Sequence, residues 1–413
     1  MKLHLSALSN KLIRENIKIT GSKSESNRLL LLQALYPNIA IDNLSNSDDA
    51  QVMQEGVKIS NGTVDIHHAG TAMRFLTTYF ASQENKEVIL TGSQRMTERP
   101  IKVLVDALNE MGAEISYVKN DGYPPLKIKG KKLRETKVSL PANISSQYIS
   151  SLLLTAPSLE NGLELELVGK ITSVPYIKMT LALLTQIGVK NSFDGNTIKV
   201  ASKPVIESVN LVVESDWSSA SYFYSIVALC EVGTEITLSA YKMNSLQGDS
   251  ILAILYKSFG VETTFENNSI KLLKVDNSIV ESSSMPIEFA LENAPDIAQT
   301  IAVTCFGMGV GCHLTGLHTL KIKETDRLEA LKTELSKLGA NISVTDKTLT
   351  LEPSNNIKKD IAIDTYNDHR MAMAFAPLAL KTPLLINDAE VVSKSFPDFW
   401  SNLKQLKFRV EDA

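Results

Sequence analysis

Basic side chains gather where short polar segments of this sequence run into apolar ones. Arginine binds carboxylates and phosphates through paired hydrogen bonds, and lysine offers a compact positive charge. The net charge of the chain is -4, which argues against general binding to nucleic acid or to an anionic membrane. The basic clusters therefore predict local sites for small polyanions. Their residues are Lys23, Arg28, Arg74, Arg95, Arg99, Lys323, Arg327, Arg370 and Lys394.

Three carboxylates fall among these cations. Asp296, in the segment ENAPDIAQT, either caps a helix or takes part in proton transfer. Glu324 lies between Lys323 and Arg327, where it is either an exposed helix start or a proton donor or acceptor whose pKa depends on desolvation. Asp326, in the same turn, is better suited to orient an arginine. A carboxylate surrounded by cations is compatible with general acid or base catalysis.

Several common catalytic motifs are missing. The segment GSKSESNR, at 21–28, resembles a phosphate-binding loop. A serine separates its glycine from its lysine, however, and Asn16 stands where a P-loop has its first glycine. No GxGxxG follows a predicted strand, and no GxSxG elbow occurs. Cys312, His313 and His318 lack the spacing of a zinc site, so we expect no metal.

The elements that must position these residues recur along the chain. Helices that end at a glycine and lead into a strand come every 72 to 79 residues, at Gly112, Gly188, Gly260 and Gly339. Glycine suits the left-handed conformation that ends a helix. A weaker copy ends at Gly56, only 56 residues before the next, and a last copy has Lys407 in the glycine position. The sequence thus repeats six times, and the first copy is about 20 residues short.

A second kind of helix alternates with the first. Its openings read SKSESNRLLLL, GTAMRFLTTYF, SSQYISSLLL, WSSASYFYSIV, PDIAQTIAV and NDHRMAMAFA. With strands between the helices, the pattern predicts six βαβαββ units, three in each of two domains, which also fits 413 residues. Helix N-termini attract anions, so we expect the openings to line one cleft between the domains. A plain solenoid is the alternative, but its repeats are usually shorter.

The composition is that of an ordinary globular protein, with 44% hydrophobic and 21% charged residues. Cys230, Cys305 and Cys312 form no CxxC pair, which favours a reducing compartment. The first residues, MKLHLSALSNKLIR, lack the apolar run of a signal peptide, and no stretch is apolar enough for a membrane span. We expect a cytoplasmic protein with no membrane and no nucleic-acid partner.

Nine motifs, in a fixed order, are similar to those of one enzyme family. They are GSKSESNR, AGTAMR, TGSQRMTERPI, SSQY, SVPY, PDIAQT, KIKETDRL, YNDHRMAMAF and SKSFPDF. The chain resembles the 5-enolpyruvylshikimate-3-phosphate (EPSP) synthases, also called 3-phosphoshikimate 1-carboxyvinyltransferases. The strings GTAMR and NDHR are highly specific, and the motifs span nearly the whole chain.

The resemblance implies an inverse α/β (α+β) barrel fold of two domains, each of three βαβαββ repeats, with the active site in the cleft between them. Residues 1–20 and 215–413 would form one domain, and 21–214, with the shortened repeat, the other. The implied reaction transfers the enolpyruvyl group of phosphoenolpyruvate to the 5-hydroxyl of shikimate 3-phosphate and releases phosphate, in the shikimate pathway to chorismate and aromatic amino acids. These two small molecules are the expected partners. We expect a monomer that needs no metal or organic cofactor.

The resemblance also assigns roles to residues. Asp296 would orient the 5-hydroxyl and take its proton, Glu324 would protonate the methylene carbon of phosphoenolpyruvate, and Lys23 would stabilise the intermediate with the arginines. How the proton steps divide among these three stays open. The positions matching phosphoenolpyruvate-binding residues are Lys23, Gly70, Arg95, Gln147, Arg327, Arg370 and Lys394. Those matching shikimate 3-phosphate-binding residues are Lys23, Ser24, Arg28, Ser145, Ser146, Gln147, Ser173, Tyr176, Asp296 and Lys323.

The chain departs from the family pattern at a few positions. His68 stands where asparagine is common, Phe75 where proline is frequent, and Thr319 where asparagine is often found. His68 and Phe75 lie beside the phosphoenolpyruvate positions, which bears on the affinity for glyphosate, the family's competitive inhibitor. Gly70 is retained, and a larger residue there would crowd glyphosate. We therefore expect glyphosate to inhibit.

Two other functions compete with this prediction. The related UDP-N-acetylglucosamine enolpyruvyl transferase has the same fold and donor, but its pattern has a loop cysteine and lacks YNDHRMAM. A non-catalytic anion-binding protein of the same fold is the other alternative. The presence of Asp296, Glu324 and Arg370 argues against it.

Overall fold

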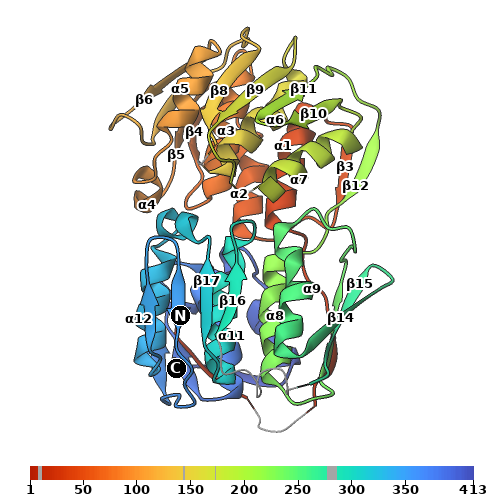
Figure 1. Ribbon diagram of the computed structural model, residues 1–413. Helices are drawn as coiled ribbons and strands as arrows, with labels where there is room; N and C mark the ends of the chain where they lie inside the picture. Colours follow the sequence, from red (N-terminus) through yellow and green to blue (C-terminus); the bar gives the residue numbers. More distant parts are fainter. Residues whose placement is uncertain (8–11, 143–144, 173, 277–285) are drawn as a thin grey trace. The chain divides into compact units, whose positions relative to one another are not determined.

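The computed structural model describes residues 1–7, 12–142, 145–172, 174–276 and 286–413. Ser173, predicted to bind shikimate 3-phosphate, lies outside the described residues. The chain forms two compact units (Figure 1). Unit 1 comprises Met1–Thr20 and Glu214–Ala413, and unit 2 comprises Gly21–Val213. The second border falls one residue earlier than the sequence placed it.

Unit 2 contains three successive repeats. The first comprises β12 (Val209–Val212), α1 (Lys23–Leu35), β3 (Ile39–Asp42) and α2 (Asp48–Gly56). The second comprises β4 (Asn61–Asp65), α3 (Gly70–Ser82), β5 (Glu87–Thr91), α4 (Gln94–Thr97), α5 (Lys102–Glu110), β6 (Glu114–Tyr117) and β7 (Leu126–Lys129). The third comprises β8 (Lys137–Pro141), α6 (Ser146–Thr155), η1 (Ala156–Ser158), β9 (Leu163–Val168), α7 (Val174–Gln186), β10 (Asn191–Asp194) and β11 (Thr197–Val200).

Unit 1 also contains three repeats. The first comprises β2 (Arg14–Ile17), α8 (Trp217–Leu229), β13 (Glu235–Ser239), η2 (Gly248–Ile251), α9 (Leu252–Leu255), η3 (Tyr256–Phe259), β14 (Val261–Glu266) and β15 (Ser269–Lys274). The second comprises β16 (Ile287–Ala290), η4 (Pro295–Ile297), α11 (Ala298–Met308), β17 (Cys312–Thr315), η5 (His318–Ile322), α12 (Arg327–Lys337), β18 (Ile342–Val344) and β19 (Leu349–Leu351). The third comprises β20 (Ile361–Ile363), α13 (His369–Phe375), η6 (Ala376–Leu380), β21 (Leu384–Ile386), η7 (Ala389–Lys394), α14 (Phe399–Gln405), β22 (Phe408–Asp412) and β1 (Leu3–Ala7).

One pairing pattern recurs in the sheets of both units. β4 and β5 run parallel, and β7 pairs antiparallel with both β5 and β6. Four more sheets have the same plan, with the orders β8-β9-β11-β10, β2-β13-β15-β14, β16-β17-β19-β18 and β20-β21-β1-β22. A parallel pair needs a crossover, which a helix supplies, whereas an antiparallel pair can close with a short turn. Each sheet is therefore one βαβαββ unit, as the sequence predicted.

The first repeat of unit 2 is the shortened one. After α2 the chain runs directly into β4 of the next repeat, and β3 pairs in parallel with β12 in a two-stranded sheet. Compared with the other sheets, this one lacks the antiparallel hairpin. A hairpin of about 20 residues accounts for the short spacing seen in the sequence. The segment GSKSESNR, which leads into α1, is unaffected.

Two strands belong to a different unit from the helix that follows them. β2 pairs with β13 in unit 1, although the chain continues into α1 of unit 2. β12 pairs with β3 in unit 2, although the chain continues into α8 of unit 1. In unit 1 the N-terminal strand β1 pairs with the C-terminal strand β22, from Leu3 opposite Asp412 to Ala7 opposite Phe408. Both chain ends thus lie in one sheet (Figure 1).

The predicted helix-ending glycines have the expected left-handed backbone. The φ angles are 98°, 77°, 70° and 103° at Gly112, Gly188, Gly260 and Gly339. Lys407, after α14, has φ 68° despite its side chain. The weaker match at Gly56 also marks a helix end, since Gly56 is the last residue of α2, but its φ is not positive and the left-handed conformation expected there is wrong. A Cβ there would lie 2.6 Å from Leu76 Cδ1, so tight packing of α2 on α3 explains this glycine.

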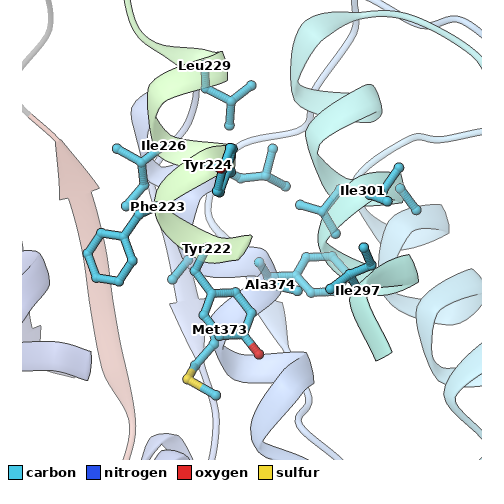
Figure 2. Close-up of a cluster of buried hydrophobic side chains, with 14 of the residues drawn as sticks. Tyr222, Phe223, Tyr224, Ile226, Leu229, Ile297, Ile301, Met373 and Ala374 are labelled. Atoms are coloured by element: carbon cyan, nitrogen blue, oxygen red, sulfur yellow. The ribbon is translucent and has the colours of Figure 1, made fainter. Parts of the chain in front are cut away.

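The core of unit 1 lies between α8, α11 and α13. Figure 2 shows Tyr222 of α8, Ile301 of α11 and Met373 of α13 in one cluster of apolar side chains. Each of these three residues is at most 1% exposed. Because the three helices share this core, the polar residues at their N-terminal ends are held in fixed positions within the unit.

Candidate functional site

The N-terminal ends of α8, α11 and α13 meet through hydrogen bonds. Arg370, the second residue of α13, donates from Nη2 to the Ser218 hydroxyl of α8, 3.1 Å away. Its Nη1 donates to the backbone oxygen of Asp296, 3.2 Å away and just before α11. Arg370 is only 9% exposed. Three of the predicted helix openings therefore come together around one buried arginine in unit 1.

Arg327 binds three carboxylates at once. Its Nη1 donates to Asp296 Oδ1 and its Nη2 to Glu324 Oε2, both at 2.8 Å. Its Nε donates to Asp368 Oδ2 at 2.7 Å. Arg327 is 1% exposed, and burial by itself would lower the pKa of its guanidinium. The three carboxylates outweigh burial and raise that pKa, so Arg327 is a permanent cation that holds the acids together.

Asp296 is surrounded by positive charge. Besides Arg327, Lys323 Nζ lies 3.4 Å from its Oδ1 and Arg370 Nη2 lies 3.6 Å from its Oδ2. Burial by itself would raise the pKa of this carboxyl. Lys323, Arg370 and Arg327 outweigh that effect and hold the pKa well below its usual range. The helix-capping interpretation is wrong, since η4 begins without a side-chain cap and this carboxylate is held by cations.

Asp326 does not have the task predicted for it, and Asp368 has that task instead. Asp326 Oδ1 accepts from the backbone N–H groups of Leu328 and Glu329, 3.2 Å away, and so caps α12. The prediction that Asp326 orients an arginine is wrong, because these backbone donors are the partners of its carboxylate. Asp368 instead orients Arg327, and it also caps α13. Glu324 is not an exposed helix start either, since it is partly buried against Arg327.

Lys394 is held beside the turn that precedes α13. Its Nζ donates to the backbone oxygen of Asn367 at 2.6 Å. Tyr366 and Asn367 both have φ 55°, a left-handed conformation that costs energy in residues other than glycine. The Tyr366 hydroxyl anchors the turn by donating to the buried carboxylate of Glu334 at 2.6 Å. The strained turn brings Asp368 to the start of α13.

In unit 2, Arg28 ties three helices together. Its Nε donates to Thr180 of α7 at 2.9 Å, its Nη2 to Ser150 of α6 at 3.0 Å, and its Nη1 to the backbone oxygen of Ser24 at 2.8 Å. Burial lowers the pKa of Arg28 to about 10, so it stays protonated at neutral pH. Its guanidinium lies 5.6 Å from the centre of the Phe75 ring. The aromatic residue that departs from the family pattern thus packs on a predicted site residue.

Asp49 links the openings of α1 and α3. Its Oδ2 lies 3.2 Å from Nζ of Lys23, the first residue of α1. Its Oδ1 lies 3.8 Å from Nε2 of His68, just before α3. Asp49 is 6% exposed on α2. The histidine that departs from the family pattern therefore shares a carboxylate with the predicted catalytic lysine.

The openings of α3 and α6 also meet. No side chain among the described residues caps α3, which starts at Gly70. A Cβ on Gly70 would lie 2.6 Å from Arg99 Nη1, so this guanidinium rests directly against the glycine. Gln147 of α6 donates from Nε2 to the Thr71 hydroxyl at 3.1 Å. Ser145 caps α6 by accepting from the Gln147 backbone at 3.4 Å.

The remaining predicted residues of unit 2 differ in their surroundings. Tyr176 accepts from Arg28 Nη2 through its backbone oxygen at 3.4 Å, and Ser146 is buried at the start of α6. Arg95 is half exposed, and within the described ranges its ionic partner is Glu98, 3.4 Å away. The contact of Arg95 with phosphoenolpyruvate stays a prediction.

The described residues offer few other sites. No group of three or more His, Cys, Asp or Glu among them is placed to hold a metal ion. A hollow of about 730 Å³ in unit 2, lined among others by Lys86, Lys129 and Arg134, includes none of the predicted site residues. Within the same part of the chain, no helix is long and apolar enough to cross a membrane.

Comparison with known proteins decides the family. Residues 54–403 match the family model described as EPSP synthase (3-phosphoshikimate 1-carboxyvinyltransferase). The chain belongs to this family. A 3-phosphoshikimate 1-carboxyvinyltransferase of Bacteroides fragilis (strain YCH46) is 42% identical over 415 residues, covering 100% of this chain and 99% of the relative. One of Haemophilus influenzae (strain PittEE) is 35% identical over 431 residues, covering 96% and 97%.

Solved structures of EPSP synthases and a related enzyme share the fold. An EPSP synthase from Acinetobacter baumannii has a TM-score of 0.81 and 22% identity, and the match covers all of both chains. The enolpyruvyl transferase NikO from Streptomyces tendae has a TM-score of 0.71 and 12% identity, over 100% and 99% of the chains. The predicted family, the two-domain α/β fold of repeated units and the enzymatic transfer of an enolpyruvyl group to shikimate 3-phosphate are confirmed.

Three groups that hold predicted site residues in place were not predicted from the sequence. Asp49 contacts Lys23, Asp368 contacts Arg327, and Ser218 contacts Arg370. Asp368 lies inside the NDHR string, and Asp49 lies in the acidic pair of SNSDDAQVM, so each carried a weak signal.

Proposed function

We propose that Asp296, Glu324 and Lys23 carry out the chemistry of the enolpyruvyl transfer in this member of the EPSP synthase family. The observation that carries the proposal is the buried guanidinium of Arg327, which lies 2.8 Å from both Asp296 and Glu324. Proton transfer requires acids and bases in fixed positions, and one rigid cation shared by two carboxylates supplies them.

The reaction makes three demands on the site. In the first stage a proton adds to the methylene carbon of phosphoenolpyruvate, while the 5-hydroxyl of shikimate 3-phosphate bonds to the central carbon and loses its proton. The tetrahedral intermediate then expels phosphate, and the methyl group gives up a proton to restore the double bond. The site therefore needs an acceptor for the hydroxyl proton, a group that exchanges a proton with carbon, and cations for the leaving phosphate.

Asp296 is suited to accept the proton of the 5-hydroxyl. Because its pKa is low, it is ionised and accepts a hydrogen bond at every working pH, but it is a weak base while Lys323 and Arg370 are directed at it. When an anionic substrate engages these two cations, they attract Asp296 less and its pKa rises. Substrate binding thereby makes Asp296 a stronger base at the moment when the hydroxyl proton must leave.

Glu324 is suited to exchange a proton with the methylene carbon of phosphoenolpyruvate. It is partly buried, and its position is fixed by Arg327. Lys23 would then stabilise the developing charge on the intermediate and the phosphate. Its ion pair with Asp49 at 3.2 Å supports this role, because the buried acid keeps the ammonium at the start of α1.

For the two substrates we retain the residue sets given by the resemblance. In unit 1 the support is that Arg370 and Lys323 both approach Asp296, and that Lys394 holds the turn before α13. In unit 2 the support is the hydrogen bonding that joins the openings of α3 and α6 through Gln147.

The test is phosphate release by the purified full chain. We expect release only when phosphoenolpyruvate and shikimate 3-phosphate are both present, and none with UDP-N-acetylglucosamine as the acceptor. Asp296→Asn should retain shikimate 3-phosphate binding in calorimetry and lose most turnover. Equal release with UDP-N-acetylglucosamine, or no release with shikimate 3-phosphate, would overturn the proposal.

We also propose that the chain acts as a monomer in the cytoplasm. Cys230, Cys305 and Cys312 are all free thiols, as suits a reducing compartment. Light scattering should give a mass near 45.3 kDa at micromolar concentration. A mass twice that value would contradict the monomer.

A further inference from the structure

Asp249 is a buried acid that is not among the predicted site residues. It contacts Ser218, the hydrogen-bond partner of the predicted site residue Arg370. It is 5% exposed and lies in η2. Its Oδ2 accepts a hydrogen bond from the Ser218 hydroxyl. The Ser218 oxygen in turn accepts from Arg370 Nη2 at 3.1 Å. A continuous hydrogen-bonded series thus runs from Asp249 through Ser218 to Arg370.

The chemistry of these three groups fixes the direction of the series. An ionised carboxylate only accepts hydrogen bonds, and a guanidinium only donates them. A serine hydroxyl has one hydrogen and can serve either neighbour. With its hydrogen on Asp249, Ser218 turns its lone pairs to Arg370. Without Asp249 the hydroxyl rotates, and Arg370 Nη2 loses a fixed acceptor.

We propose that Asp249 is a positioning residue for the transfer reaction and that it acts through Ser218 to orient the Arg370 guanidinium toward the anionic substrate. The other terminal nitrogen, Nη1, donates to the Asp296 backbone oxygen at 3.2 Å. A guanidinium held at both terminal nitrogens has one orientation, and this sets the direction in which it can fork onto a carboxylate or phosphate. The proposal rests on the proposed binding of phosphoenolpyruvate by Arg370.

The charge of Asp249 agrees with this role. Burial raises the pKa of its carboxyl to about 6, and the nearby charge of Asp296 adds to the rise. Arg370 and the hydrogen bond from Ser218 lower it again. At neutral pH the carboxylate is therefore mostly ionised, as an obligatory acceptor must be.

The segment that carries Asp249 is anchored independently of it. The Gln247 side chain accepts from the Trp217 backbone at 2.9 Å and donates to the Ser215 backbone oxygen at 2.9 Å. These bonds hold η2 against the start of α8. Replacing the Asp249 side chain should therefore change the orientation of Arg370 without releasing the segment.

Steady-state kinetics of the full chain test the proposal with four variants. Asp249→Ala and Ser218→Ala should each raise the KM for phosphoenolpyruvate about tenfold, the scale of one charge-assisted hydrogen bond, with kcat changed less than about threefold. Asp249→Asn keeps an acceptor oxygen and Ser218→Thr keeps the hydroxyl, so each should stay within about threefold of the wild-type KM.

A matched control and a double variant separate positioning from general damage. Ser225→Ala removes a hydroxyl two turns along α8, where it accepts from Thr304 at 2.8 Å. This control should lower the melting temperature and leave the KM unchanged. In an Arg370→Lys background, Ser218→Ala should have no further effect on KM, because its influence passes through the guanidinium.

Each outcome bears on the proposal. An unchanged KM in Asp249→Ala, equal damage from Asp249→Asn and Asp249→Ala, or additive effects in the double variant would overturn it. If the wild type released no phosphate, the proposed function would fail by itself. Crystal structures would then decide the inference, which expects the Arg370 guanidinium to turn away in Ser218→Ala and to keep its place in Ser218→Thr.

Discussion

Arg327 and Asp368 form a fully buried ion pair, with 2.7 Å between Nε and Oδ2 and exposures of 1% and 0%. The same guanidinium holds Asp296 and Glu324, the two carboxylates proposed to move protons. Removing one partner from such a cluster leaves buried charges without compensation, which is costly. Stability and catalysis in unit 1 therefore depend on one side chain.

Arg327→Lys should lower both the stability of the protein and its turnover. Lysine keeps the charge but cannot reach three carboxylates with a planar fork. We expect a loss of about 3 kcal/mol in the free energy of unfolding and a fall in turnover of about 100-fold or more. Urea unfolding and phosphate release measure the two effects. Lys332→Met removes an exposed pair with Glu329 on the same helix and should cost less than about 1 kcal/mol. Equal losses in both variants would contradict the argument.

Glu324→Gln should separate chemistry from binding. Glutamine keeps an oxygen that accepts from Arg327 Nη2, but it cannot act as an acid or base at neutral pH. Turnover should fall at least about 100-fold, while calorimetry still detects shikimate 3-phosphate binding. The matched control is Glu329→Gln, an exposed residue of α12 that should keep nearly full turnover. Near-normal turnover in Glu324→Gln would mean that another group protonates the carbon.

Local signals in the sequence were enough to predict the repeat and the helix openings. The glycine at Gly112 marks a left-handed helix end through its own backbone, and the polar cluster before α13 marks a helix start. Such signals depend on neighbouring residues alone. The structure contains the predicted helix ends and helix starts because each repeat has its own copy of these signals.

The contacts between the openings could not be predicted in the same way. Asp326 and Asp368 both precede an arginine-bearing helix start, and nothing local shows which of them reaches Arg327. Likewise Ser218 and Asp249 are 31 positions apart, and their hydrogen bond exists because η2 folds back on α8. Tertiary packing determines which of these side chains contact each other, and the spacing of residues in one sequence does not show it.

Gly70→Ala should weaken phosphoenolpyruvate binding without unfolding the protein. The added Cβ would lie 2.6 Å from Arg99 Nη1, the end of a flexible side chain that can move aside. We expect the KM for phosphoenolpyruvate to rise about tenfold, glyphosate to inhibit less, and the melting temperature to change little. By contrast, Gly162→Ala places its Cβ 2.2 Å from the Val200 backbone oxygen at φ 69° and should destabilise by about 2 kcal/mol. A wild-type KM in Gly70→Ala would show that the space beside Arg99 is not used.

Lys407→Gly should stabilise the protein. Lys407 has φ 68° after α14, where a side chain costs about 1 kcal/mol and glycine does not. We expect the free energy of unfolding to rise by about 0.5 to 1 kcal/mol with turnover unchanged. Gly112→Lys is the reverse change at an equivalent position, with φ 98° and no atom within 4 Å of the new Cβ, and should destabilise by a similar amount. Shifts of the same sign in both variants would refute the explanation.

Because of Lys274, the free energy of unfolding should depend on pH in the alkaline range. Its side chain is 0% exposed, and burial lowers the pKa of its ammonium to about 8 from 10.5. Between these values the unfolded chain binds a proton that the folded chain has lost, so the free energy of unfolding rises with pH from about 8 to 10.5. Below pH 8 the buried ammonium costs about 3 kcal/mol.

Lys274→Met tests this relation. At pH 7 the variant should be more stable by about 2 kcal/mol, since the relieved charge outweighs the lost hydrogen bond to the Phe259 backbone oxygen. The advantage should shrink as pH rises through the range from 8 to 10.5, because the wild-type lysine then becomes neutral when folded and later when unfolded. Urea unfolding at pH 7 and pH 10 measures it. The exposed Lys257→Met should change stability by less than about 0.5 kcal/mol at both. An advantage that stays constant with pH would mean that folding does not lower the pKa of Lys274, so that burial of its ammonium is not the cause.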